Sequence, residues 1–127
     1  MFELEINGQV YQFKFGMGFM REINKKLKTP IDGVKDATQN IGLRMAIASV
    51  LDGDVEGLVD LLEVANKTET PRVTKNLLDE YIDNENTDID KLFDDVKDFL
   101  SRANATKKTY NALMQMVEEE KAKKANS

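Results

Sequence analysis

The most suggestive chemical pattern in the sequence is a run of carboxylates over residues 52–63. Calcium loops of the EF-hand type take twelve residues, with a glycine at position six and a glutamate at position twelve. Gly57 occupies the glycine position here. Carboxylates stand at positions one, three, five, nine and twelve: Asp52, Asp54, Glu56, Asp60 and Glu63. This spacing makes a calcium site one interpretation of the segment.

Two features of the same segment favour a different interpretation. Glu56 is one methylene longer than the side chains usual at the fifth position, and it would crowd the ion. Apolar residues also recur at helical spacing through the segment and beyond it: Val55, Leu58, Val59, Leu62 and Ala65. We therefore predict a helix-capping turn at 52–54 followed by a helix, with an EF-hand-like calcium-binding module as the alternative.

The other residue types offer little to an enzyme. The chain contains no His and no Cys, which removes the usual general base, the thiolate nucleophile and the commonest zinc ligands. Ser49 and Ser101 fall in helical patterns, and neither has a His to activate it. Gly16 and Gly18 lack the third glycine of a phosphate-binding loop. We predict no catalytic residue, no cofactor and no metal, and a protein that is not an enzyme.

The net charge of the chain limits the kinds of partner that it can bind. Its 127 residues include 23 Asp and Glu against 18 Lys and Arg, for a formal net charge of −5. Such a balance argues against nucleic acid and against an anionic membrane surface as partners, because both attract clustered Lys and Arg. The sequence also has no long apolar run, no signal pattern and no cysteine pair, and we therefore expect a cytoplasmic protein.

Residues 2–15 are predicted to form a β-hairpin. Asn7-Gly8 is the dipeptide that a two-residue type I′ turn prefers, since both of its positions need a positive φ. Counting outward from that turn places Phe2 opposite Phe13 and leaves charged and amide side chains mostly on the other face. The apolar face then contains six side chains: Phe2, Leu4, Ile6, Tyr11, Phe13 and Phe15.

The rest of the chain has the apolar periodicity of about five to six helices. We expect helices near 17–28, after Thr29-Pro30, at 41–51, at 55–66, and after caps at Thr74, at Thr87 or Asp88, and at Thr106. The 41–51 segment is the most continuously apolar one, and it is predicted to run through the core. The expected fold class is α+β and predominantly α-helical, with one domain over 1–127, a helical body over 17–117 and a frayed charged tail over 118–127.

Two apolar groups are candidates for binding another protein. One follows the hairpin: Phe13, Phe15, Met17, Phe19 and Met20. The other lies near the C-terminus: Tyr110, Leu113, Met114 and Val117. Each group can pack on the core of the chain itself or receive an apolar partner, because Met and Phe side chains adapt to varied surfaces. Core packing is favoured for the first group, whereas the second adjoins the charged tail, which leaves docking on a partner open.

Several short segments, in this order and spacing, resemble a known family. They are Phe-Lys-Phe-Gly-Met-Gly-Phe-Met-Arg-Glu-Ile-Asn-Lys (13–25), Leu-Asp-Gly-Asp (51–54), Thr-Pro-Arg-Val-Thr (70–74), Asp-Glu-Tyr-Ile-Asp (79–83), Asp-Ile-Asp-Lys-Leu-Phe (88–93) and Thr-Lys-Lys-Thr (106–109). The sequence is similar to the tail assembly chaperones of long, non-contractile-tailed phages and prophages of Gram-positive bacteria. The similarity extends over nearly the whole chain.

This resemblance implies a non-catalytic role in virus assembly. A protein of this kind would bind the tape measure protein, help to recruit major tail tube protein subunits, and act in the host bacterial cytoplasm without remaining in the mature virion. Self-association of the chain would be compatible with that role. A small acidic adaptor protein with no part in assembly is the other alternative. The sequence does not identify the binding face.

Overall fold

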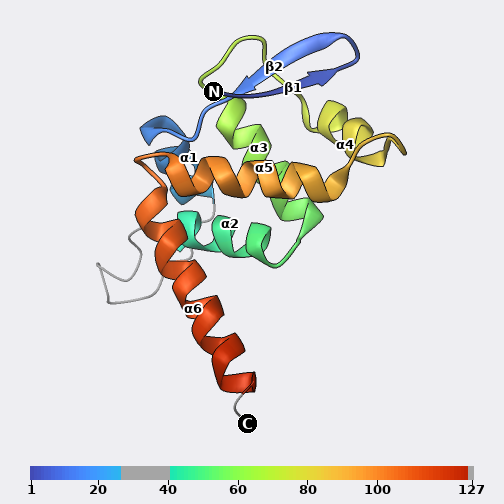
Figure 1. Ribbon diagram of the computed structural model, residues 1–127. Coiled ribbons are helices and arrows are strands. Elements are labelled where there is room, and N and C mark those ends of the chain that lie inside the picture. Colours follow the sequence, from blue (N-terminus) through green and yellow to red (C-terminus); the bar gives the residue numbers. More distant parts are fainter. Residues whose placement is uncertain (27–40, 126–127) are drawn as a thin grey trace.

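The computed structural model describes residues 1–26 and 41–125, and in these residues a two-stranded hairpin precedes six helices. The elements are β1 (Phe2–Ile6), β2 (Gln9–Phe13), α1 (Met17–Lys26), α2 (Ile41–Leu51), α3 (Val55–Asn66), α4 (Lys75–Asp83), α5 (Ile89–Arg102) and α6 (Lys107–Ala125). The hairpin lies at one end of the molecule, and α6 projects from the other (Figure 1). The predicted α+β, mainly helical class is confirmed.

The hairpin has the predicted register. Asn7 and Gly8 have φ values of 52° and 80°, which are the left-handed values that a type I′ turn requires. Phe2 pairs with Phe13, and the side chains along β1 alternate between buried and exposed. Since opposed residues share a face, the six predicted apolar side chains, including Phe15 beyond the pairing, are all buried.

Helix α3 forms the centre of the core. Seven of its twelve residues are buried, including Leu58, Leu61 and Leu62, none of which is exposed at all. Helices α1, α2 and α4 and strand β2 all contact it. Helix α2 keeps the predicted bounds and buries Leu43, Ile47 and Val50. A single hydrophobic cluster joins the hairpin, α1 to α5 and the first half of α6.

Three of the helices begin at capping side chains. Asp54 accepts a hydrogen bond from the backbone N–H of Glu56, which confirms the predicted capping turn at 52–54. Thr74 caps α4 and Asp88 caps α5, both by accepting a backbone N–H from the first turn of their helix. Of the two predicted caps for α5, Asp88 is the one used.

The prediction that the Thr106 side chain caps the last helix is wrong, because its hydroxyl bonds to the preceding helix. The buried Thr106 hydroxyl donates to the backbone carbonyl of Leu100 at 2.7 Å, and its weaker second contact is the Ala103 carbonyl at 3.4 Å. It therefore satisfies the open Leu100 carbonyl at the end of α5 rather than an N–H at the start of α6. The bond to Leu100 is buried, so the hydroxyl serves as the partner of that carbonyl in place of water.

The predicted end of the helical body at residue 117 is also wrong, because α6 continues to Ala125. Glu, Lys and Ala all favour helices, and Glu119 and Glu120 each lie four positions before a Lys, the spacing that supports a helix through opposite charge. Residues 118–125 have no apolar stripe, but their residue types still favour a helix. The predicted helix after Thr29-Pro30 lies outside the described residues, as does the predicted end of the first helix near residue 28.

Candidate protein-binding surface

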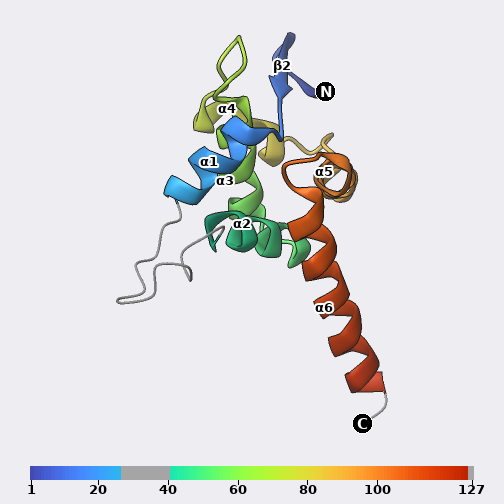
Figure 2. The ribbon, with the colours of Figure 1, turned by 90° about the vertical axis from the view of Figure 1, so that its left-hand side faces the viewer.

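The two halves of α6 lie in different surroundings. Tyr110 and Leu113 pack against the core cluster, where α6 contacts α5 and α2. From Glu118 to Lys124 every residue is exposed. A helix of 19 residues is about 28 Å long, and Figure 2 shows its second half running away from the other helices. The apolar side chains at the middle of α6 therefore stand where the body ends.

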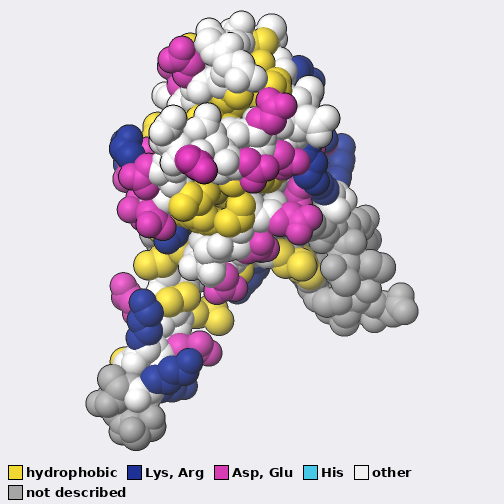
Figure 3. Space-filling model, turned by 90° about the vertical axis from the view of Figure 1, so that its right-hand side faces the viewer, with side chains coloured by type: hydrophobic (Ala, Val, Ile, Leu, Met, Phe, Trp, Pro, Cys, Tyr) yellow, Lys and Arg dark blue, Asp and Glu magenta, His cyan; other side chains and the backbone are white. Residues whose placement is uncertain are grey.

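A groove of about 360 Å³ lies between α2 and this part of α6. Its apolar walls come from both helices: Ala48 and Leu51 on α2, and Leu113, Met116 and Val117 on α6. Met116 is 54% exposed. Asp52, Glu119, Glu120 and Lys123 complete the lining with charge. In Figure 3, hydrophobic side chains gather on the projecting helix near the body, and charged ones lie among them and beyond.

An apolar floor inside a charged border is suited to the apolar stripe of an amphipathic segment, since unbranched Met side chains adjust to different shapes. At the body end of α6, partial burial, with Asp98 nearby, raises the pKa of Tyr110 above its ordinary value. Tyr110 is thus neutral at physiological pH, as suits its packing against the core.

The predicted residues of the second apolar group divide between the core and the groove. Leu113 and Val117 line the groove, Tyr110 packs on the core, and Met114 is half-buried outside the groove lining. Sequence reasoning missed Met116, Ala48 and Leu51. A signal for Met116 existed, because it lies three positions after Leu113 and so falls on the same side of a helix.

The first predicted group is mostly core in this structure. Phe13, Phe15 and Phe19 are each at most 5% exposed, and the Phe15 and Phe19 rings meet edge to face with centroids 5.3 Å apart. A partner could not reach these rings without displacing them, so their assignment to a binding surface is replaced by the core interpretation. Met17 is 48% exposed, and Met20 is half-buried against the core.

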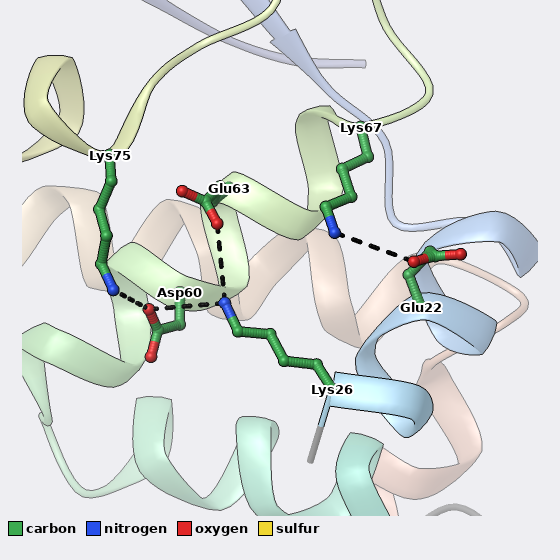
Figure 4. Close-up of polar contacts among 6 residues, drawn as sticks. All are labelled: Glu22, Lys26, Asp60, Glu63, Lys67 and Lys75. Carbon is green, nitrogen blue, oxygen red and sulfur yellow. Dashed lines mark ion pairs between the residues drawn. The ribbon is translucent and has the colours of Figure 1, made fainter. Parts of the chain in front are cut away.

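The calcium-loop alternative requires a conformation that the chain does not adopt. Residues 55–63 lie in α3, and Asp54 is occupied as the helix cap. Asp60 and Glu63 instead form ion pairs with Lys26 of α1, at 3.7 and 3.6 Å, and Asp60 pairs with Lys75 of α4 at 2.9 Å (Figure 4). Within residues 1–26 and 41–125, no group of three or more carboxylates is arranged to hold a metal ion.

Helix α1 is joined to α3 by a further ion pair in the same region. Glu22 lies 3.9 Å from Lys67, just after the end of α3 (Figure 4). The carboxylate of Asp60, paired with Lys75 at 2.9 Å, raises the pKa of Lys75 above its ordinary value. Two of the carboxylates that suggested a metal site, Asp60 and Glu63, therefore connect α1 and α4 to α3, which is a structural role.

Comparison with known proteins identifies the family. Residues 3–115 match the model of the phage tail assembly chaperone proteins. This chain belongs to that family. No curated protein and no solved structure gives a match.

The tail assembly chaperone match covers the hairpin, α1 to α5 and the first half of α6, and Met116 and Val117 follow directly after it. The family name assigns the chain to the assembly of phage tails, so the resemblance to tail assembly chaperones is confirmed. None of the described helices is both long enough and apolar enough to span a membrane.

Proposed function

We propose that this chain binds an amphipathic helical segment of the tape measure protein in the groove between α2 and α6. The observation that carries the proposal is the set of apolar side chains, with Met116 the most exposed, on a helix that continues past the body. An unassembled tape measure protein presents apolar helical stripes, and covering them prevents their aggregation. The net charge of −5 would keep the resulting complex in solution.

In this proposal the chaperone acts by binding alone, without catalysis and without a cofactor. It works in the cytoplasm of a Gram-positive host, brings major tail tube subunits to the covered tape measure protein, and is released before the virion is complete. Helix α6 suits such a temporary complex, because its exposed half can be contacted from several sides without opening the core. Self-association would place several grooves along one tape measure chain and increase the avidity.

Co-expression with the tape measure protein of the same phage tests the proposal. The wild-type chain should retain the tape measure protein in the soluble fraction and co-purify with it. Met116→Asp should abolish both effects, because a carboxylate in the groove must be desolvated when the apolar partner binds. Met17→Asp is the matched control, since Met17 has a similar exposure of 48% but lies away from the groove.

Three results would contradict the proposal. One is the absence of any complex with the wild-type chain, which would favour the adaptor alternative. Another is undiminished binding by Met116→Asp. The third is an equal loss of binding with Met17→Asp, which would show an effect of charge in general. Adding the major tail tube protein to the purified complex tests recruitment. If the tail tube protein is recruited, all three proteins should elute together. If it is not, it should elute apart from the complex of chaperone and tape measure protein.

A further inference from the structure

The two edges of the hairpin present different backbone groups. In a two-residue hairpin the residues that flank the turn, here Ile6 and Gln9, exchange both backbone hydrogen bonds, and such pairs alternate along the strands. The backbone groups of Glu3 and Glu5 therefore point away from β2, toward the outer edge of β1. The groups of Gln12 likewise point to the outer edge of β2, because Gln12 pairs with Glu3.

The outer edge of β2 is covered by the end of α3. The carbonyl of Gln12 accepts a hydrogen bond from Nδ2 of Asn66 at 2.9 Å, and the N–H of Lys14 donates to the carbonyl of Ala65 at 2.9 Å. Both contacts lie on the side that the hairpin geometry assigns as outward, which supports the assignment for β1 as well. Asn66 is itself buried, so the part of this edge from Gln12 to Lys14 is closed to another strand.

The outer edge of β1 is open. Among the described residues, no hydrogen bond involves the N–H or the carbonyl of Glu3 or Glu5 on this side. A groove of about 560 Å³ runs there between β1, α4, α5 and the turn that joins these helices. Residues from both faces of β1 line it, as expected for a groove that follows the edge of the strand. Its apolar lining includes Leu4, Ile6, Tyr81 and Leu92.

The charge of this groove indicates what kind of polypeptide segment could bind in it. Five carboxylates line it, against one described cation, Lys91, which lies 3.7 Å from one of them, Asp95. The carboxylates are Glu3, Glu5, Glu80, Asp88 and Asp95. Edge pairing with β1 of a second copy would set Glu3 and Glu5 against the same two residues, and like charges on opposed strands repel. A basic segment meets no such barrier.

We propose that the β1 edge binds an extended segment of a partner protein in which Lys or Arg alternates with apolar residues. The segment adds a third strand, with its backbone bonded to Glu3 and Glu5. Since side chains alternate along a strand, its basic residues then lie beside the Glu3 and Glu5 carboxylates, and its apolar residues lie beside Leu4 and Ile6. This site lies on another face than the α2–α6 groove and takes a strand instead of a helix, so it does not depend on the function proposed above.

The decisive variant is Glu5→Pro, measured by the fluorescence anisotropy of a labelled, capped peptide that alternates Lys and Val. Proline removes the outward N–H of residue 5. The hydrogen bonds between β1 and β2 are kept, because residue 5 makes none of them. We expect the affinity to fall about tenfold. Two controls accompany it. Glu5→Gln loses the same charge but keeps the N–H, and Val10→Pro changes the opposed residue on β2. Both control variants should bind the peptide more tightly than the Glu5→Pro variant does.

A second measurement leaves the protein unchanged and so stands even where a variant fails to fold. The same peptide, N-methylated at alternate residues on its strand-pairing edge, keeps its charge and loses backbone donors. Binding should weaken by about tenfold, and the Glu3 and Glu5 amides should be protected from hydrogen exchange only by the unmethylated peptide. Absence of binding by the unmodified peptide, or equal binding of the methylated one, would overturn the proposal. Failure of tape measure binding would not affect either result.

Discussion

The apolar group after the hairpin and the apolar group on α6 are both candidate binding surfaces from the sequence, yet they differ in what surrounds them. Phe13, Phe15 and Phe19 are enclosed. On α6, Leu113 and Val117 are half-buried, and Met116 is exposed. In the described residues the first group is followed by helices α2 to α6, which can close over it, whereas α6 extends beyond the elements that could cover it.

The difference teaches that exposure of an apolar stripe depends on the length of its neighbours and not on its own pattern. The hairpin is reached by α5, whose Phe99 ring meets that of Phe2 with centroids 5.3 Å apart. Helix α2 ends at Leu51, beside the middle of α6. A surface for a partner therefore arises where one helix of a packed pair continues and the other stops.

Truncating Phe13 should have the largest effect, because it empties a closed part of the core. Phe13→Ala is expected to lower the free energy of unfolding by about 3–5 kcal/mol, measured by urea denaturation. Met17→Ala, in the same apolar group but exposed, should change it by less than about 0.5 kcal/mol. Similar values for the two variants would remove the distinction between enclosed and accessible members of the group.

Asn66 should come next. It donates to the carbonyls of Gln12 and Pro71 and accepts the N–H of Val73 at 2.6 Å. Asn66→Ala leaves buried backbone groups unpaired, and we expect a loss of about 2–3 kcal/mol in the same urea assay. Asn111→Ala, at an exposed site on α6, is the matched control and should be nearly neutral. Equal effects would mean that the hairpin docks on α3 through apolar contacts alone.

Asp60→Asn should have a smaller effect, because its ion pairs with Lys26 and Lys75 are partly exposed. The melting temperature should fall by less than in Asn66→Ala. Lys75 has a raised pKa and binds its proton more tightly in the folded state. Its contribution is therefore complete below its ordinary pKa of about 10.4 and is lost as the pH rises through the folded value. Thermal melts should show the wild-type advantage over Asp60→Asn shrinking above that pH.

Ending the chain after Val117 should have the least effect on stability. The removed residues up to Lys124 are exposed, and the free energy of unfolding is expected to change by less than about 0.5 kcal/mol. Far-ultraviolet circular dichroism should show the loss of helix. A large destabilisation would mean that the projecting half of α6 supports the body, and the contrast between the two regions would then fail.

Much of the fold could be predicted because its determinants are local. The Asn7-Gly8 turn fixes the hairpin register, and Thr74 and Asp88 mark helix starts within one turn of the bonds they make. The α2–α6 groove could not be predicted in the same way. Helix α2 is apolar on nearly all of its sides, so its sequence pattern does not indicate which side is left without a packed helix or strand. Ala48 and Leu51 became groove residues only through the place where α6 crosses α2.

Thr106 and Asn66 illustrate a second limit. A threonine before a helical pattern predicts a cap, yet the hydroxyl of Thr106 meets the end of the preceding helix because the corner is tight. Asn66 appears in sequence as the polar end of a helix. Its role depends on Gln12, which is far away in the chain, and no local pattern indicates that contact.

The bond between Asn66 and Gln12 also has a kinetic consequence. The hairpin itself forms from neighbouring residues within about 1–10 μs, whereas Asn66 and Gln12 are separated by 54 positions. Closing so large a loop carries an entropic cost that must be met before the bond can form. The bond should therefore form late on the folding path and act mainly on the unfolding rate. Asn66 would then determine how long the docked hairpin persists and have little influence on how quickly the chain first becomes compact.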